Sequence, residues 1–246
     1  MIIGDLLRIC TNLNKKPSLN PIDHNTMKYE ITNETHSICP NLHRIRALKD
    51  FGNVNKGDLG GWIESEKNLS QEGNCWVFED ARVYEDARVH GYADVSGNAR
   101  VHGNAIVSGY AEVSGNAIVS GCAWVSGYAE VSGNARVSGY AMVYGDARVF
   151  EDAEVSGCAK VSGDAKVSGD SKVSGDSKVS GYAKVSGNAK VSGCAEVSGN
   201  AKVSGCAEVS DEVVTGNTWV TGNTEEPVSQ FPNEITIDGV IYVKKV

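Results

Sequence analysis

Valine recurs at every sixth position through the middle of the chain. It stands at position 77 and at each sixth position up to 209, which makes 23 consecutive hexapeptides without a miss. Alanine or serine precedes each valine by two residues, except for Cys75, and from Val95 onward glycine follows most valines by two. The repeating unit is V-S-G-x-A-x, set in a polar background that would otherwise be typical of a linker.

The hexapeptide predicts a short strand followed by a tight corner. Side chains alternate along a strand, so the alanine and the valine of an A-x-V triplet share one face. The glycine of the S-G-x corner supplies the positive φ that a tight turn needs. Strands this short bury a face when successive units wind into a coil that stacks on the coil below. We therefore predict a β-solenoid with valine and alanine inside.

The residue before each alanine indicates how many hexapeptides make one coil. Like residues recur there at intervals of 18 or 36: Tyr92, Tyr110 and Tyr128; Asn98, Asn116 and Asn134; Cys122, Cys158 and Cys194. Three hexapeptides per coil follow, which predicts a triangular prism over residues 72–210. The stretch "GDSKVSGDSKVSG" at 169–181 keeps the same phase, so we interpret it as folded coil, with a flexible linker as the alternative.

The two ends of the chain lack this regularity. Residues 27–71 contain the strand-like segments "MKYEIT" and "LHRIRAL" and are predicted to form an N-terminal cap that covers the open edge of the first coil. Residues 1–26 show no clear pattern, as expected of a leader or a disordered segment, and Met27 is a candidate start. In 211–246 the valine phase slips by one residue, which predicts an irregular last turn. The segment "ITIDGVIYV" then predicts a hairpin that caps the last coil.

The passage from Ala47 to Val83, "ALKDFGNVNKGDLGGWIESEKNLSQEGNCWVFEDARV", resembles the first segment of the YdcK-type hexapeptide-repeat proteins of bacteria and their phages. The matching residues are Asp50-Phe51, Gly60-Gly61-Trp62, Leu69-Ser70-Gln71 and Gly73-Asn74-Cys75-Trp76. The resemblance implies an all-β, single-stranded, left-handed parallel β-helix, with a bacterial or phage origin. It also implies the acyltransferase activity that is assigned to such proteins from their fold.

Composition and charge narrow the class of protein. The chain carries a formal net charge of −8, divided into −7 over 72–158 and +3 over 159–204, and no segment is basic enough to predict nucleic-acid binding. No run of 18 apolar residues exists, so we expect a cytoplasmic protein without a membrane span. The seven cysteines include no C-x-x-C pair, which favours a reducing compartment and predicts no metal site.

Histidine is the candidate base for acyl transfer. His90 and His102, the only histidines in the repeat, occupy a corner slot that usually holds serine, and they lie on different corners. No insertion interrupts the 23 units, so we expect nothing to build a pocket. We predict no catalytic residue and no cofactor. The alternative is an acyltransferase that uses acetyl-CoA, with His90 or His102 as its base.

Lysines crowd the outward positions of the later repeats. They stand at 160, 166, 172, 178, 184 and 190, mixed with aspartates. Consecutive hexapeptides lie on successive faces of the prism, so we expect a solvated collar rather than a stripe. The alternative is a site for nucleic acid or lipid headgroups.

Three outward positions on one face are apolar. Ile106, Trp124 and Met142 follow one another at intervals of 18, and Tyr140 and Tyr144 flank Met142. The core does not need these side chains, and an exposed apolar stripe is typical of an interface. The sequence therefore predicts a rigid, non-catalytic β-solenoid that serves as a binding or scaffold module. We expect this face to bind a protein partner or a second copy in a homo-oligomer.

Overall fold

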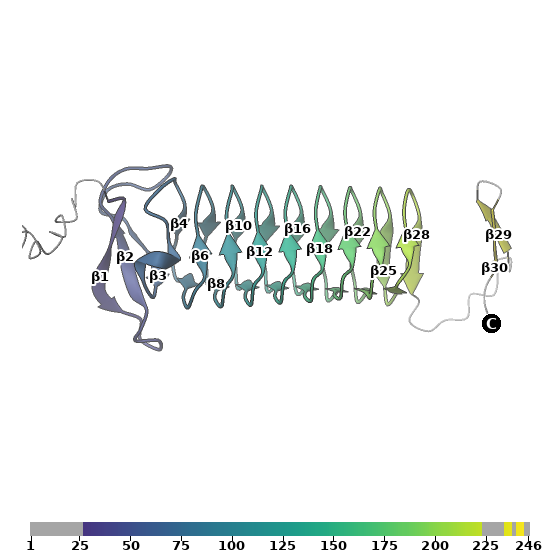
Figure 1. The fold of residues 1–246 in the computed structure, drawn as a ribbon, viewed down its shortest axis with the longest axis horizontal. Coiled ribbons are helices and arrows are strands. Elements are labelled where there is room, and N and C mark those ends of the chain that lie inside the picture. Colours follow the sequence, from purple (N-terminus) through teal and green to yellow (C-terminus); the bar gives the residue numbers. More distant parts are fainter. Residues whose placement is uncertain (1–26, 223–233, 238–239, 244–246) are drawn as a thin grey trace, which may run out of the picture.

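The computed structural model describes residues 27–222 together with strands 234–237 and 240–243, and this part of the chain contains no α-helix. Residues 72–222 wind into a rod of stacked coils, and each coil contributes one strand to each of three parallel sheets (Figure 1). The predicted β-solenoid with three hexapeptides per coil is therefore confirmed. Its left-handedness stays a prediction that rests on the resemblance.

We number the three sheets of the rod 1 to 3. The rod part of sheet 1 contains β5 (Arg82–Val83), β8 (Arg100–Val101), β11 (Ile118–Val119), β14 (Arg136–Val137), β17 (Glu154–Val155), β20 (Lys172–Val173), β23 (Lys190–Ser192) and β26 (Glu208–Ser210). Sheet 2 contains β4 (Trp76–Val77), β7 (Asp94–Val95), β10 (Glu112–Val113), β13 (Glu130–Val131), β16 (Arg148–Val149), β19 (Lys166–Val167), β22 (Lys184–Val185), β25 (Lys202–Gly205) and β28 (Trp219–Gly222). Sheet 3 contains β6 (Arg88–Val89), β9 (Ile106–Val107), β12 (Trp124–Val125), β15 (Met142–Val143), β18 (Lys160–Val161), β21 (Lys178–Val179), β24 (Glu196–Val197) and β27 (Val213–Val214).

The core of the rod is a column of valines and alanines. Every repeat valine from 77 to 209 is at most 1% exposed, including Val173 and Val179, so the polar stretch at 169–181 is folded coil as interpreted. Backbone hydrogen bonds run from coil to coil along the rod. For example, the N–H of Arg100 donates to the carbonyl of Ala117 at 2.9 Å. Each coil thus satisfies the backbone of its neighbour, as stacking repeats require.

Glycine forms most corners because the backbone there is left-handed and crowded. Gly127 has a φ of 73°, and a Cβ added to it would lie 2.8 Å from the backbone nitrogen of Gly145 in the next coil. Three corners use glutamate instead: Glu79, Glu85 and Glu151, with φ of 53°, 59° and 61°. Their carboxylates accept hydrogen bonds from the N–H groups of Gly97, Gly103 and Gly169, at 2.8, 2.7 and 2.6 Å respectively.

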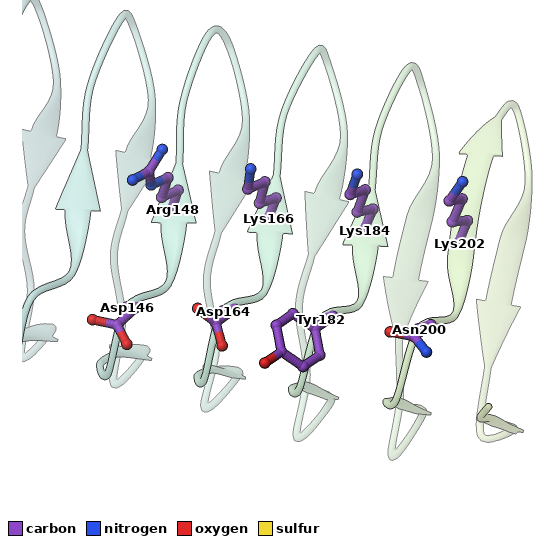
Figure 2. A pocket seen from close by; sticks show the side chains of 8 residues that line it. All are labelled: Asp146, Arg148, Asp164, Lys166, Tyr182, Lys184, Asn200 and Lys202. Atoms are coloured by element: carbon purple, nitrogen blue, oxygen red, sulfur yellow. The ribbon is translucent and has the colours of Figure 1, made fainter. Parts of the chain in front are cut away.

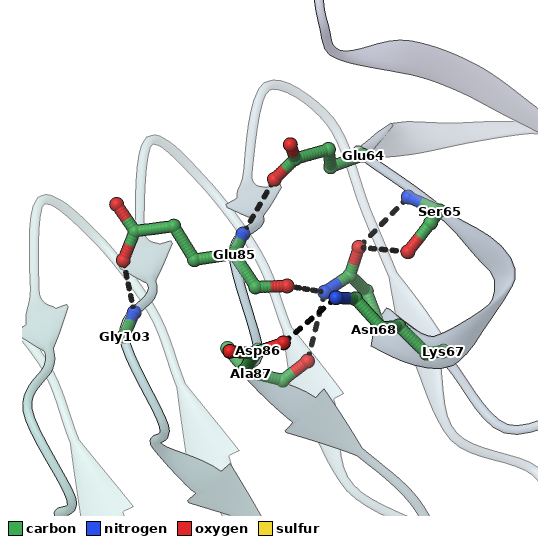
Figure 3. Close-up of polar contacts among 8 residues, drawn as sticks. All are labelled: Glu64, Ser65, Lys67, Asn68, Glu85, Asp86, Ala87 and Gly103. Atoms are coloured by element: carbon green, nitrogen blue, oxygen red, sulfur yellow. Dashed lines mark hydrogen bonds and ion pairs between the residues drawn. The ribbon is translucent and has the colours of Figure 1, made fainter.

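The segment 27–71 continues sheet 1 beyond the first coil. It forms β1 (Tyr29–Thr35), β2 (His43–Ala47) and β3 (Leu59–Ile63), which pair antiparallel in that order, and β3 then pairs parallel with β5. The 3-10 helix η1 (Glu66–Asn68) follows, and its buried Asn68 donates to the carbonyls of Glu85 and Ala87 at 2.9 Å each (Figure 3). Glu64 accepts the N–H of Glu85 at 2.6 Å in the same figure. These bonds join the segment to the first coils.

The far end of the rod keeps its register despite the phase slip. Val214 pairs with Val197 and Val220 with Val203, so one coil closes with one residue fewer, as the sequence predicts. Strands β29 (Glu234–Ile237) and β30 (Val240–Val243) pair antiparallel. The predicted turn between them, and the predicted leader at 1–26, lie outside the described residues. Within the described residues, no helix is long and apolar enough to cross a bilayer.

Candidate functional site

The predicted apolar residues stack on successive strands of sheet 3. Trp124 pairs in register with Ile106 on one side and with Met142 on the other. Trp124 is 48% exposed, which is unusual for a residue of this size, while Ile106 and Met142 are half-buried. Register alone therefore brings the three side chains together. We call Ile106, Trp124, Met142 and the neighbouring Tyr144 the apolar patch.

A hollow of about 310 Å³ opens within the apolar patch. Its lining residues are Trp124, Ser126, Met142 and Tyr144. The indole Nε1 of Trp124 donates to Ser108 Oγ at 3.1 Å, which lays the ring back over the preceding coil and buries Ser108. Tyr140, also predicted to belong to this surface, is 68% exposed and does not line the hollow. The bond to Ser108 thus positions the indole that forms one wall of the hollow.

A second hollow lies where the N-terminal segment meets the first coils. It measures about 320 Å³ and is lined by Cys39, Asn41, Leu42, Glu64, Arg82, Tyr84, Glu85 and Arg100. The expectation that nothing builds a pocket was wrong here, because the loop between β1 and β2 supplies a wall that the repeats lack. Arg82 and Arg100 pair in register, which places two guanidinium-bearing side chains on adjacent coils of this hollow.

The structure keeps the two repeat histidines apart. His102 follows β8 in sheet 1, where its ring stacks on Tyr84 at 4.9 Å between centroids and its Nδ1 lies 3.7 Å from Glu85 Oε2. His90 follows β6 in sheet 3 and is exposed. They lie on different corners, as predicted. His102 borders the second hollow through Tyr84 and Glu85, while burial raises the pKa of Tyr84.

A stripe of cations runs along sheet 2. Arg148, Lys166, Lys184 and Lys202 occupy consecutive strands in register, beside a corner column of Asp146, Asp164, Tyr182 and Asn200 (Figure 2). Together they line a groove of about 490 Å³. The six lysines from 160 to 190 surround the rod as the predicted collar, two on each sheet. The prediction missed the stripe, which forms because Arg148 and Lys202 extend the pair of Lys166 and Lys184 along sheet 2. Reading every third hexapeptide would have revealed the stripe.

Other reactive groups do not assemble into a site. Among the described residues, no three of His, Cys, Asp and Glu cluster closely enough to hold a metal ion. The six described cysteines are free, and Cys122, Cys158 and Cys194 are exposed along one corner column. We therefore take the apolar patch, the hollow beside the N-terminal segment and the stripe on sheet 2 as the candidate sites.

These features define a parallel β-solenoid whose candidate sites lie on its flat faces and where the first coils meet its N-terminal segment. Comparison with known proteins identifies the type of repeat, because the family model of the YdcK β-solenoid repeat matches residues 93–109 and 129–145. The chain is also 44% identical over 57 residues to the Escherichia coli (strain K12) protein named "Uncharacterized acetyltransferase YdcK". That match covers 23% of this chain and 16% of the relative. The resemblance to YdcK-type repeat proteins is confirmed to this extent.

Proposed function

We propose that the chain is a rigid, non-catalytic β-solenoid that binds a partner protein through the apolar patch on sheet 3. The observation that carries the proposal is the exposure of Trp124 in register with Ile106 and Met142. Removing apolar surface from water favours association by ~25 cal/mol per Å². A tryptophan held in place by a hydrogen bond loses little freedom on binding, which suits it as an anchor.

The geometry suggests how a partner would be held. An apolar side chain of the partner enters the hollow lined by Trp124, Met142 and Tyr144, and the tyrosine contributes both an apolar ring and a hydroxyl that can hydrogen-bond the partner. The rod itself contributes rigidity, because each strand is bonded to strands above and below it. Partner and rod would meet without reorganisation of the backbone, which keeps the entropic cost of binding low.

The test is a matched pair of substitutions on two faces. Trp124→Glu should leave the circular dichroism unchanged, since the side chain points outward, and should abolish recovery of a specific partner from the native host. Ile118→Glu is the control, because Ile118 is an outward apolar residue of sheet 1 that pairs with Arg100 and Arg136. Equal recovery with both variants would contradict the proposal.

Acyl transfer from acetyl-CoA is the second candidate function. The name of the Escherichia coli relative and the hollow beside His102 favour it. In such an enzyme His102, held by Tyr84 and Glu85, would act as the general base, and Arg82 and Arg100 would attract the phosphates of the cofactor. Against it, no loop leaves the coils within residues 72–222 to cover the long pantetheine arm.

Calorimetric titration with acetyl-CoA separates the two candidates. Micromolar binding that His102→Ala preserves and Arg100→Glu removes would establish the cofactor site and overturn the non-catalytic proposal. No heat of binding at millimolar acetyl-CoA, together with loss of the partner in Trp124→Glu, would support the binding module.

A further inference from the structure

The outward side chains of sheet 2 are sorted by charge along the rod. Seven consecutive strands carry first an acidic segment and then a basic segment, which together we call the charge ladder: Asp94, Glu112, Glu130, Arg148, Lys166, Lys184 and Lys202. Sheet 1 differs, because its later strands mix the two signs and form ion pairs within one copy. Lys172 lies 3.3 Å from Glu154, and Lys190 lies 2.7 Å from Glu208.

Within one copy of the chain the charge ladder is poorly compensated. In the described residues, its one internal ion pair joins the two segments, between Glu130 and Arg148 at 3.3 Å. Elsewhere like charges face each other on neighbouring strands, which is unfavourable. At the acidic end, burial and in second place the charge of Glu112 raise the pKa of Asp94 to about 6. At the basic end, the Nζ of Lys202 lies over the ring of Trp219, 4.1 Å from its centroid. The other charges of the ladder away from the Glu130–Arg148 pair are offered to an external partner.

Read in the reverse direction, the charge ladder has the opposite sign at every position except the central one. Arg148 is the central position, with three acids on one side and three bases on the other. A second copy turned by a twofold axis through this centre places Asp94 opposite Lys202, Glu112 opposite Lys184, and Glu130 opposite Lys166. Both copies share the strand spacing of ~4.8 Å, so all these pairs form in one register. We propose that sheet 2 is the interface of an antiparallel homodimer held by the charge ladder.

The columns beside the ladder fit the same twofold axis. On one edge, Tyr92, Tyr110 and Tyr128 are exposed and stack at 4.8 and 4.9 Å between ring centroids. The twofold axis sets Tyr110 opposite Tyr182, and Tyr128 opposite the carboxylate of Asp164. The opposite edge is lined by serines except at its middle, where half-buried Phe150 would meet its own copy on the axis. The same axis sets Arg148 against its own copy, and each of these guanidinium groups stays paired with Glu130 of its own chain at 3.3 Å. The centre of the interface thus combines one apolar contact with two ion-paired arginines.

The size of the face sets the expected strength of the dimer. Seven strands at ~4.8 Å, on a face roughly 15 Å wide, bury on the order of 400–500 Å² per copy, below the standard size of a stable interface. The dimer should therefore be weak and sensitive to salt, which screens exposed charges beyond about 10 Å at 0.1 M. The groove along the basic segment offers a rival occupant, a linear polyanion.

Sedimentation equilibrium of the full chain tests the dimer. We expect a monomer–dimer equilibrium at about 0.05 M salt that shifts to monomer at about 0.5 M. Lys184→Glu and Glu112→Lys should each weaken the dimer at least tenfold, since each places like charges opposite one another twice. Both changes also put opposite charges on neighbouring strands within a copy, so loss of the dimer cannot be attributed to loss of folding.

Rescue experiments fix the register. The double variant Glu112→Lys with Lys184→Glu should regain the dimer, and an equimolar mixture of the two single variants should form a heterodimer. A monomeric wild type at low salt would overturn the proposal, and retention of inorganic polyphosphate by that monomer would assign the basic segment to a polyanion. Unchanged association in both single variants would place the interface elsewhere. Trp124→Glu changes sheet 3 and should keep the dimer. The dimer on sheet 2 and the partner site on sheet 3 can therefore be contradicted separately.

Discussion

Glu151 accepts a hydrogen bond from the backbone N–H of Gly169, one coil further along the rod, at 2.6 Å. Glu151 has a φ of 61° at a corner where most coils use glycine. A left-handed backbone is costly for a residue with a Cβ. The bond to Gly169 offsets part of this cost, and the same arrangement at Glu79 and Glu85 indicates one shared solution.

Two substitutions of Glu151 should separate the stabilisation by its hydrogen bond from the cost of its left-handed backbone. Glu151→Ala keeps the strained φ and loses the carboxylate, so the free energy of unfolding should fall by about 1–2 kcal/mol. Glu151→Gly loses the same bond and relieves the backbone, so its effect should be smaller by about 1 kcal/mol. Urea denaturation measures both, and equal losses would show that the backbone strain is negligible.

Ser171 should be a site of easy stabilisation. It replaces the usual inward alanine, is fully buried, and its Oγ has no hydrogen-bond partner in the structure. Ser171→Ala should raise the free energy of unfolding by about 1–3 kcal/mol. Ser177→Ala is the control, because the buried Ser177 hydroxyl donates to the Ser174 carbonyl at 2.7 Å. A thermal melt that gives both variants the same gain would contradict the assignment.

The polar stretch at 169–181 should respond to substitution as a core does. Val173→Asp buries a carboxylate without a partner and should cost about 3 kcal/mol or more. Lys172→Asp changes the adjacent outward residue, which pairs with Glu154 in an exposed position, and should cost under about 1 kcal/mol. Similar melting temperatures for the two variants would mean that this stretch is not packed.

Asp94 should make stability depend on pH. Its folded pKa of about 6 lies above the ordinary 3.8, so the charged form is disfavoured in the fold, and this penalty is fully present above pH 6 and gone below about pH 4. The causes that raise it are burial and Glu112, while Lys28 and the Trp76 backbone oppose them. Asp94→Asn should therefore stabilise the rod at pH 8 by about 1–2 kcal/mol after solvent screening, and not at pH 4.

Thermal melts at the two pH values measure this difference. They are best made in the Lys184→Glu background, where dimerisation does not contribute to the melting temperature. A gain that is the same at pH 8 and pH 4 would show that Asp94 destabilises the rod for a reason other than its charge.

The rod could be predicted from the sequence because every hexapeptide repeats the same inward, outward and corner positions. Inward Val173 and stacked Tyr110 each sit in a periodic slot, so period and residue type were enough to place them. The N-terminal segment has no period, and the wall that its β1–β2 loop gives to the second hollow depends on contacts that only folding reveals. The Trp124–Ser108 bond depends on one side-chain rotamer, which the sequence does not encode visibly.

The separation of acidic from basic residues on sheet 2 was missed for a different reason. Every residue of the ladder was visible in the sequence, and so was the split of net charge between 72–158 and 159–204. The alignment of Lys166 and Lys184 with Arg148 and Lys202 was nevertheless missed, because the pattern was followed hexapeptide by hexapeptide along the chain. In a solenoid, neighbours in space are 18 residues apart, so the chemistry of a face must be read at that step.

The 18-residue closure shared by the coils from Val77 to Val209 also bears on how such a gene evolves. Loss or duplication of one whole coil in frame joins valine to valine and corner to corner, so the product folds as a rod one strand spacing shorter or longer. The length of the rod can therefore change by one coil at a time, and every intermediate length still folds. The faces are not uniform, however, and losing the coil that contains Glu130 or Lys166 would unbalance the acidic and basic segments. Selection on pairing between copies would then hold the length of the rod constant.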